Sequence, residues 1–366
     1  MITRRQFLKG SAIGSCCLGA AAIGGYALLN SKRFGRLPQG ERLERILSSP
    51  NYRDGKFWNL PTAYIPPQRQ PDGRGGLKSM FFKKKKLHLE PNRFDIQVIK
   101  SDLENLDREK DLFVWFGHSS YFLQLGGARI LVDPVFCSAS PIPFLIGEAF
   151  PGTDVFTPED IPDIDILLIT HDHWDHLDYE TVCALKNRVG MVVTSLGVGE
   201  HFEYWGYESE RIEELDWGEK AIIDCGRIGV SVRAYPTHHF SGRGFTRNKT
   251  LWSSFLVSAA GKKIYFGGDG GYDERFRHIG ETMPGIDLAF LENGQYNQHW
   301  PRVHTMPDEL PLAMRELGAK KYVTGHHAKF CFSTHPWDEP YKNELAAAAY
   351  AKVPLLVPEI GEICEI

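Results

Sequence analysis

The stretch Ile164-Asp-Ile-Leu-Leu-Ile-Thr170, followed directly by His171-Asp-His173-Trp-Asp175-His176, determines how the rest of this chain is interpreted. The apolar run predicts a buried β-strand, and the polar residues after it predict a turn at the end of that strand. The turn holds three histidines and two acids within six residues. Imidazole and carboxylate are ligands that Zn(II), Fe(II) and Mn(II) accept. We interpret the turn as part of a metal site rather than a solvated loop, because such a cluster is costly without metal or water partners.

The spacing of these residues suits two ions. His171 and His173 lie two residues apart, so in an extended or turn conformation both can bind one ion. Asp175 and His176 are adjacent and can reach a second ion beside it. The pattern His-x-His-x-Asp-His resembles the signature of the metallo-β-lactamase superfamily of binuclear metal hydrolases. The resemblance implies an α/β fold, an αββα sandwich of two mixed sheets flanked by helices.

The composition is that of a globular enzyme and argues against several other classes of protein. With 366 residues, of which 42% are hydrophobic and 24% charged, the chain can bury a large core. The net charge of -4 argues against general nucleic-acid binding, so we expect no nucleic-acid partner. The seven cysteines include no Cys-x-x-Cys pair, so neither a zinc ribbon nor a disulfide framework is indicated.

Residues 1–29 are predicted to be a twin-arginine-type signal or a membrane anchor. Arg4-Arg5-Gln-Phe-Leu-Lys9 precedes an apolar stretch, Ser11–Leu29, and this order resembles a twin-arginine export signal. The alternative is an ordinary export signal with a fortuitous arginine pair. The stretch is long enough to remain in a membrane. We therefore expect export to the periplasm or cell envelope, with membrane association through the amino terminus.

Two further regions follow. Residues 30–90 are predicted to be a loop-rich amino-terminal extension, because proline and glycine interrupt this region and its periodicity is weak. Residues 91–366 are predicted to be the catalytic domain. There, short apolar strands end in polar residues: 113–116 before His118, 130–132 before Asp133, 230–235 before His238 and His239, 264–266 before Asp269, 288–291 before Glu292, and 322–324 before His326 and His327. Sites in α/β proteins form where strand carboxyl ends open into loops, so we expect these residues to gather.

Helices are predicted between the strands. Asp178 can cap a helix over residues 179–185. A helix over 307–317 has Pro307 near its start and Gly318 after its end. A third helix is predicted over the alanine-rich residues 345–352, and the last residues, 355–366, are predicted to form a short strand pair.

Two ions need more ligands than the central pattern contains, since about three protein ligands per ion are common. From the chemistry alone, either His238 or His239 can complete the first ion. Either His326 or His327 can complete the second. Asp269 can bridge both ions because a carboxylate offers one oxygen to each, and its neighbouring glycines leave room for a close approach.

Three later patterns resemble one branch of the superfamily, which contains the N-acylphosphatidylethanolamine-hydrolysing phospholipase D. They are Tyr235-Pro-Thr-His-His239-Phe-Ser-Gly-Arg243, Phe266-Gly-Gly-Asp269-Gly-Gly-Tyr272 and Gly325-His326-His-Ala-Lys-Phe330. The resemblance covers most of the chain and implies that His239 and His326 are the ligands at the two ambiguous places. The metal ligands that it implies are His171, His173, Asp175, His176, His239, Asp269 and His326.

The same resemblance implies substrate-binding residues. In the phospholipase, a tyrosine between the second histidine and the aspartate of the signature contacts substrate. Trp174 has that place here and keeps the aromatic surface without the hydroxyl. A histidine before a helix rich in Pro and Glu lies near the substrate head group, and His304 matches it. His118 and Asp133 are expected to support the site rather than bind metal.

The function implied by the resemblance is that of a binuclear metal hydrolase with two divalent ions, expected to be Zn(II). A hydroxide bridging the ions would attack a phosphodiester, with Asp269 as the bridging residue and His304 or a coordinated water protonating the leaving group. The expected partner is a small-molecule or phospholipid substrate. Two alternatives stay open: a metal-dependent lactonase of the same superfamily, and a non-catalytic envelope protein that retains metal. A di-iron oxygen-reducing protein is disfavoured, because no flavodoxin-like or rubredoxin-like segment is recognised.

Overall fold

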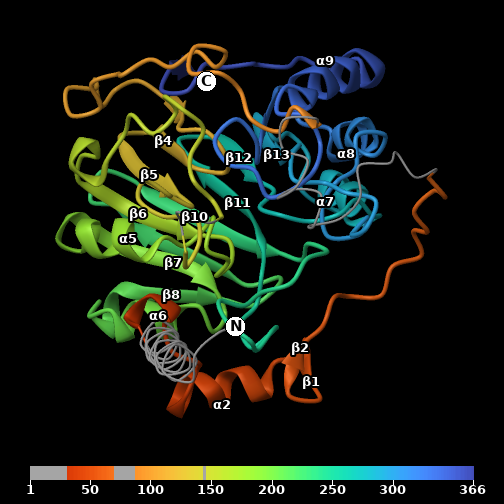
Figure 1. Ribbon diagram of the computed structural model, residues 1–366. Coiled ribbons are helices and arrows are strands. Elements are labelled where there is room, and N and C mark those ends of the chain that lie inside the picture. Colours follow the sequence, from red (N-terminus) through yellow and green to blue (C-terminus); the bar gives the residue numbers. More distant parts are fainter. Residues whose placement is uncertain (1–30, 70–86, 143–145) are drawn as a thin grey trace, which may run out of the picture.

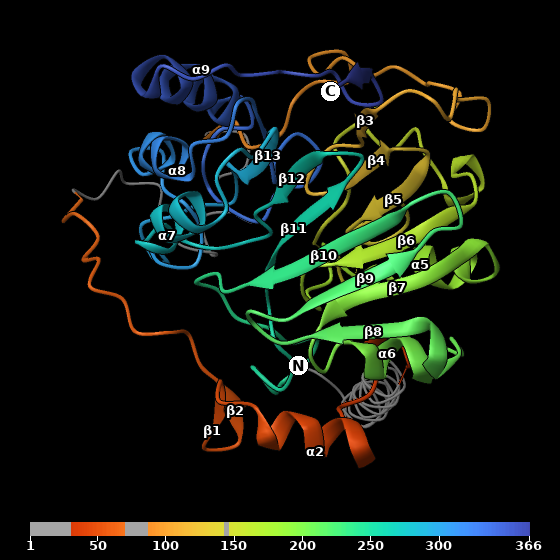
Figure 2. The same ribbon diagram turned by 180° about the vertical axis from the view of Figure 1, so that it is seen from behind.

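Two β-sheets lie face to face at the centre of the protein, and helices cover their outer faces (Figure 1 and Figure 2). The computed structural model describes residues 31–69, 87–142 and 146–366. The architecture is the predicted αββα sandwich of two mixed sheets. The signal or anchor predicted for residues 1–29 lies outside the described residues. Within the described ranges, no helix is both long and apolar enough to cross a membrane.

The first sheet has seven strands. In spatial order they are β15 (Ile363–Glu365), β3 (Leu112–Trp115), β4 (Tyr121–Leu125), β5 (Ala128–Val132), β6 (Ile164–Ile169), β7 (Val189–Ser195) and β8 (Ile212–Leu215). The pairs from β15 to β5 are antiparallel, and those from β5 to β8 are parallel. The apolar run that was predicted as a strand is therefore β6, in the parallel part of the sheet.

The second sheet has six strands. In spatial order they are β14 (Tyr322–Gly325), β13 (Leu288–Glu292), β12 (Lys262–Phe266), β11 (Ser254–Ala259), β10 (Gly229–Tyr235) and β9 (Lys220–Asp224). The pairs from β9 to β12 are antiparallel, and those from β12 to β14 are parallel. Strands β12, β13 and β14 therefore end at the same edge of the sheet, where polar residues follow them.

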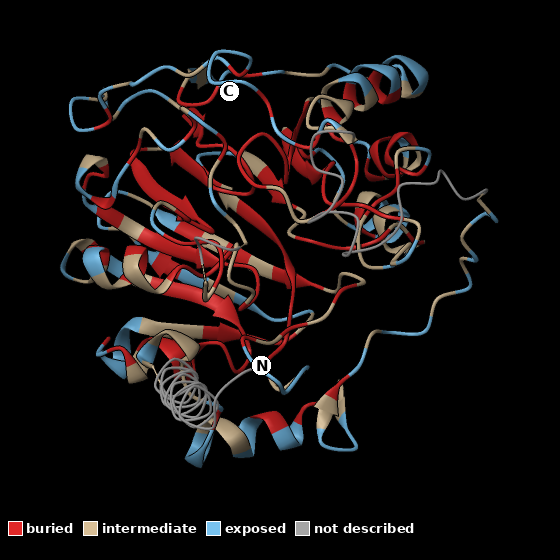
Figure 3. Ribbon diagram, in the orientation of Figure 1, coloured by how far each residue is buried: buried red, intermediate tan, exposed pale blue. Residues whose placement is uncertain are grey.

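Most strands are buried on both faces, as Figure 3 shows. Along β5, Ile130 packs in the core between the sheets, whereas Leu131 packs in the cluster under the helices. Along β13, Phe290 packs between the sheets and Leu291 packs toward the helices of the other side. Strands buried on both faces have continuous apolar sequences rather than alternating ones. This explains why runs such as 164–169 are apolar throughout.

Each sheet has its own covering helices. On the seven-stranded sheet lie α5 (Tyr179–Leu185) and α6 (Gly199–Tyr204), and on the six-stranded sheet lie α7 (Arg275–Thr282), α8 (Leu310–Leu317) and α9 (Glu339–Ala351). The prediction for α5 is confirmed, and the Asp178 carboxylate accepts a hydrogen bond from the Glu180 N–H at 3.2 Å.

The predicted bounds of α8 and α9 need correction. Helix α8 begins at Leu310 rather than Pro307, because residues 306–309 form a separate turn in which the Glu309 N–H donates to the Met306 carbonyl. Gly318 ends α8 as predicted, in the left-handed conformation with φ 65°. Helix α9 begins six residues earlier than predicted, with Pro340 in its first turn, where a missing N–H costs no hydrogen bond.

The predicted strand pair over 355–366 is wrong. Only β15 forms a strand there, antiparallel to β3, and Leu355 makes an isolated bridge to Tyr322. Pro354 and Pro358 lack the N–H groups that a longer ladder would need.

The extension over residues 30–90 contains more structure than its loop-rich prediction. Helix α2 (Gly40–Ser48) and a two-stranded hairpin of β1 (Tyr52–Arg53) and β2 (Lys56–Phe57) lie in it. The side chain of Ile46, fully buried, packs with Trp252 of the main body. The helix was missed because nine residues with one buried side chain give too short a periodic signal.

Candidate metal centre

All seven predicted ligands meet at the edge where the strands end. Three groups of potential ligand atoms form there, and within each group the atoms lie within 4.8 Å of one another. The first group is His171, His173, His239 and Asp269, and the second is His118, Asp175, His176 and His326. The third group shares Asp269 and His326 with these two and adds Glu292 and His304. The ligands come from the ends of β6, β10, β12 and β14. The two sheets thus bring together side chains separated by more than 150 positions in the sequence.

In the first group, three imidazoles face one another. His173 Nδ1 lies 2.9 Å from His171 Nε2 and 3.1 Å from His239 Nε2. The Asp269 Oδ2 atom lies 3.6 Å from His239 Nε2 and 4.0 Å from His171 Nε2. Three nitrogens and one carboxylate oxygen therefore surround one small volume.

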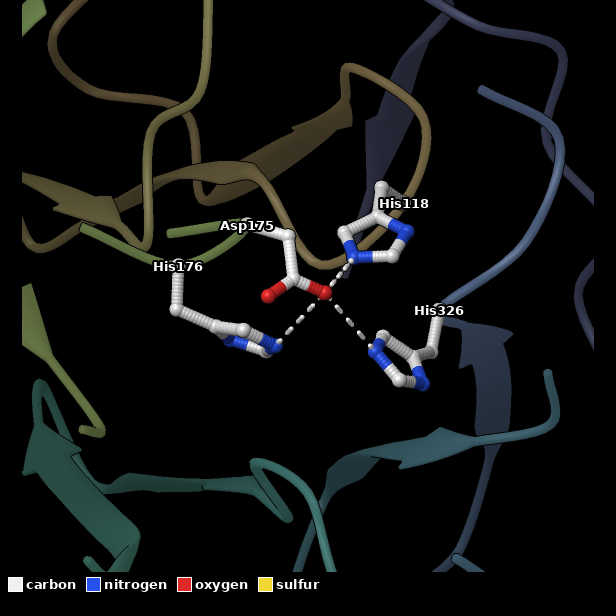
Figure 4. A group of neighbouring side chains, drawn as sticks. All are labelled: His118, Asp175, His176 and His326. Atoms are coloured by element: carbon white, nitrogen blue, oxygen red, sulfur yellow. Dashed lines mark hydrogen bonds and ion pairs between the residues drawn. The ribbon is translucent and has the colours of Figure 1, made fainter. Parts of the chain in front are cut away.

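In the second group, the side chains gather around one oxygen of Asp175 (Figure 4). The Asp175 Oδ2 atom lies 2.9 Å from His118 Nε2, 3.5 Å from His326 Nε2 and 3.9 Å from His176 Nε2. His118 was predicted to support the site, and its contact with Asp175 is of that kind. Its nitrogen also lies among the potential ligand atoms.

Asp269 lies between the two groups. Its Oδ1 atom is 3.2 Å from His176 Nε2, and its Oδ2 atom is 3.2 Å from His326 Nε2. It also faces His239 of the first group. The backbone around it is tight: Gly268 has φ +58°, and a Cβ atom at Gly270 would lie 1.7 Å from the Thr237 hydroxyl. Glycine at these two positions allows the Asp269 carboxylate to reach both groups.

The hydrogen bonds on the far side of the rings fix which nitrogen faces the centre. His239 Nδ1 lies 2.7 Å from the Val303 carbonyl, which can only accept, so Nδ1 carries the proton and Nε2 presents a lone pair. His176 Nδ1 lies 2.8 Å from the Asp133 carboxylate, which also accepts, so Nδ1 of this ring carries a proton and Nε2 faces the centre. Partners of this kind orient metal-binding histidines in proteins.

His171 is oriented through a short relay. The Thr170 hydroxyl donates to Asp133 Oδ2 at 2.6 Å, so its oxygen is left to accept from His171 Nδ1 at 3.0 Å. His171 Nε2 then presents a lone pair toward His173. Asp133 was predicted to support the site, and it contacts His176 directly and His171 through Thr170.

The donor set fits divalent cations. Three buried atoms that face the centre, His176 Nε2, Asp269 Oδ1 and His326 Nε2, make no hydrogen bond within the described protein. Burial lowers the pKa of His173 to about 4, so this imidazole is neutral. Burial also acts to lower the pKa of His176 and His326, but nearby carboxylates, above all Asp269, outweigh it and raise both, that of His326 to about 10, so a bound cation would displace protons from these two rings. Neutral imidazoles with buried carboxylates are a donor set for zinc, iron or manganese.

His238 and His327, the alternatives left open by the chemistry, point elsewhere. His238 Nδ1 lies 3.7 Å from Asp273, and His327 Nε2 lies 3.3 Å from the Thr324 hydroxyl. Neither belongs to a potential ligand group among the described residues.

Glu292, at the end of β13, is a residue of the site to which sequence reasoning gave no role. Its Oε2 atom lies 2.8 Å from His304 Nδ1 and 3.4 Å from His326 Nδ1. Its Oε1 atom accepts from the N–H groups of Gly270 and Thr305. The signal was present, because Glu292 follows an apolar strand as the ligands do. The structure places His304 beside the centre, with Nδ1 4.0 Å from Asp269 Oδ2.

A hollow of about 510 Å³ opens beside the centre, and His173 and Asp175 form part of its wall. Trp174 lies in this wall between them, and its indole N–H donates to the Arg243 carbonyl at 3.2 Å. The remaining lining is largely apolar and includes Phe34, Ile142, Phe240, Phe245 and Phe332. The predicted substrate-contacting position therefore faces open space next to two candidate metal ligands.

The fold and the cluster of ligand-like side chains define a metal-dependent hydrolase of the metallo-β-lactamase type. Residues 128–327 match the beta-lactamase superfamily domain, and the chain belongs to this superfamily. The fold agrees with that of Igni18, a metallo hydrolase from Ignicoccus hospitalis, at a TM-score of 0.54 with 19% identity, covering 70% of this chain and 98% of that one.

Two relatives narrow the resemblance. An uncharacterized protein of Mycobacterium tuberculosis is 36% identical over 86% of this chain and 84% of its own length. The N-acyl-phosphatidylethanolamine-hydrolyzing phospholipase D 1 of Caenorhabditis elegans is 27% identical over 86% of this chain and 93% of its own length. The resemblance to the phospholipase branch is thus confirmed along most of both chains.

Proposed function

We propose that this protein is a binuclear metal hydrolase, loaded with zinc, that cleaves phosphodiesters of the N-acyl ethanolamine phospholipid type. The observation that carries the proposal is the orientation of the histidines. Val303, Asp133 and Thr170 hold the protons of three rings on the outside, so that lone pairs face two adjacent groups joined by Asp269. The similarity to the nematode phospholipase supports a phospholipid substrate.

The residues of the chain have separable tasks in this proposal. Bound divalent ions would supply an activated water and stabilise negative charge on the substrate oxygens. Asp269 would keep the two groups at a fixed separation, since its Oδ1 atom faces His176 of the second group and its Oδ2 atom faces His239 of the first. His304 is hydrogen-bonded to Glu292 through Nδ1, which leaves Nε2 available to protonate the leaving group.

The location of the protein is also part of the proposal. The twin-arginine pattern in residues 1–29 supports export to the periplasm or cell envelope, where a phospholipid substrate would be accessible. Fractionation of cells that express the full chain, compared with a variant in which Arg4 and Arg5 are replaced by lysine, tests this. Unchanged export of the lysine variant would contradict the twin-arginine assignment.

Asp269→Ala tests the metal assignment. We expect the variant to lose bound metal, measured by elemental analysis, and to lose hydrolysis of an N-acyl phosphatidylethanolamine in detergent micelles. Asp163→Asn, at an exposed position, is the matched control and should keep both properties. If Asp269→Ala keeps two metal ions and full turnover, the assignment is wrong. If the wild type hydrolyses soluble lactones and no phosphodiester, the lactonase alternative replaces this proposal.

A further inference from the structure

Residues 32–36 lie against the signature turn, although more than 130 positions separate the two in the sequence. The Phe34 ring meets the Trp174 ring edge-on, with 5.0 Å between the ring centres. The Arg33 carbonyl accepts from Arg243 Nη2 at 2.9 Å and from Nε at 3.2 Å. The amino-terminal segment thus contacts the residue that we place at the substrate.

A second connection fixes the same segment. The Arg36 N–H donates to His201 Nδ1 at 3.1 Å, so His201 Nε2 carries the proton and donates to Asp172 Oδ2 at 3.2 Å. Asp172 is buried and lies between two candidate ligands in the signature. The segment is therefore held on both sides of Phe34.

Arg243 connects the amino-terminal segment to the signature turn, and its side chain is not available to bind substrate. Its guanidinium lies 4.0 Å from the centre of the Trp174 ring, a cation–π contact. Its nitrogens donate to the backbone carbonyls of Arg33, Asp172 and Leu177. The side chain is buried, so the Phe34–Trp174–Arg243 contact is a fixed wall.

Phe34 stands between two hollows. It lines the hollow of about 510 Å³ that contains His173 and Asp175, and also a neighbouring hollow of about 290 Å³ that contains Asp172 and His201. The residues common to both linings are Phe34, Gly242, Arg243, Gly244 and Phe245. Among these, Phe34 is the side chain that the amino-terminal segment contributes.

We propose that Phe34 is a specificity-determining residue that closes the larger hollow and limits the length of the apolar chain that the substrate can place there. This inference rests on the proposed function, because it assigns the larger hollow to a lipid chain attached to the reacting phosphate. The hollow is continuous with candidate ligands and is lined mostly by aromatic and aliphatic side chains, which suit an alkyl or acyl chain. Removing the Phe34 ring would enlarge the larger hollow toward its neighbour, because Phe34 lines both.

The test compares the zinc-loaded full chain with Phe34→Ala and Phe34→Trp. The substrates are p-nitrophenyl phosphodiesters whose second ester is ethyl, octyl or hexadecyl. Each methylene transferred from water into an apolar site contributes about 0.8 kcal/mol, or about fourfold in kcat/KM. Two or three additional buried methylenes in Phe34→Ala should raise the hexadecyl-to-ethyl ratio about 16- to 64-fold, and Phe34→Trp should lower it.

Binding of ethyl, octyl and hexadecyl phosphonate, measured by titration calorimetry, repeats the comparison without turnover. Phe94→Ala is the matched control, since Phe94 is 81% exposed and lines neither hollow, and it should leave the ratio unchanged. Equal ratios in all four proteins, in hydrolysis and in binding, overturn the inference. If no protein hydrolyses the esters but Phe34→Ala shifts phosphonate binding toward long chains, the proposed function fails and the role of Phe34 in chain length stands.

Discussion

Replacement of Asp133 by asparagine should weaken metal binding without unfolding the protein. Asp133 accepts hydrogen bonds from His176 Nδ1 at 2.8 Å, from the Thr170 hydroxyl at 2.6 Å and from the Thr170 N–H at 2.8 Å. Burial raises the pKa of Asp133, and the hydrogen bonds from His176 and Thr170 oppose that shift. The charge of the carboxylate makes His176 a better ligand, and asparagine keeps the shape while removing that charge.

The expected loss of metal affinity in Asp133→Asn can be estimated from the contact that Asp133 makes with His176. Loss of a residue that orients a metal-binding histidine typically weakens metal affinity about 10- to 100-fold, or about 1.4 to 2.7 kcal/mol. Asp133 contacts His176 directly and His171 through Thr170, so both groups of ligands should be affected. With free zinc at about 1,000 times the wild-type dissociation constant, metal binding stabilises the wild type by about 4.1 kcal/mol. Asp133→Asn should lose about 1.4 to 2.7 kcal/mol of this stabilisation.

The assay is urea unfolding of each protein with excess chelator and again at fixed free zinc. The difference between the two unfolding free energies isolates the metal term from any change in the apo protein. Asp163→Asn, on an exposed position, makes the same chemical change away from the site and should show the wild-type difference. If Asp133→Asn and wild type gain the same stability from zinc, Asp133 does not support the ligands and the orientation argument for His176 fails.

Two further predictions concern residues outside the ligand set. Asn59→Ala should weaken zinc affinity up to about tenfold compared with the control variant Asn187→Ala. The reason is that the Asn59 side chain accepts a hydrogen bond from the His239 N–H at 3.1 Å and donates one to the His239 carbonyl at 2.9 Å. Equal zinc affinity of the two variants in a competition titration would refute this. Glu344→Gln should flatten the fall in unfolding free energy between pH 4.5 and 7, compared with the exposed Glu281→Gln. Burial raises the pKa of Glu344 to about 7, so the folded chain holds a proton that the unfolded chain releases, and stability is lost as the pH rises. An identical pH dependence in the two glutamine variants would show that Glu344 is not the group responsible.

The ligands were predictable because each follows an apolar run in the local sequence. His171, Asp269 and His326 come within three residues of the ends of strands that are largely buried, so the sequence marks the strand and its end together. Parallel strands end at one edge of a sheet, and this rule brings distant residues to one place. The resemblance was needed only where two histidines are adjacent. The structure agrees with the choice made there, since His239 and not His238 faces the centre.

The parts that were missed depend on contacts between distant segments. Asn59 and Phe34 lie in the extension, where no periodic pattern marks a residue as part of a site. Their roles follow from which loop the extension meets, and local sequence does not contain that information. The start of α9 was missed for another reason, since the first residues of that helix are polar and include Pro340, which is read more readily as a loop.

The candidate ligands and the wall of the hollow beside them belong to different parts of the chain, so substrate preference can vary without a change in the ligands. The candidate ligands are held by strand ends in the core, where a substitution would cost stability as well as any metal affinity. The hollow beside them is lined in part by Phe34. This residue belongs to a short segment in which Pro38 is buried and the neighbouring residues are partly or fully exposed. A change at Phe34 alters the space for substrate without touching either sheet. In the proposed function, the extension would therefore set the length of the accepted chain while the sandwich keeps the chemistry constant.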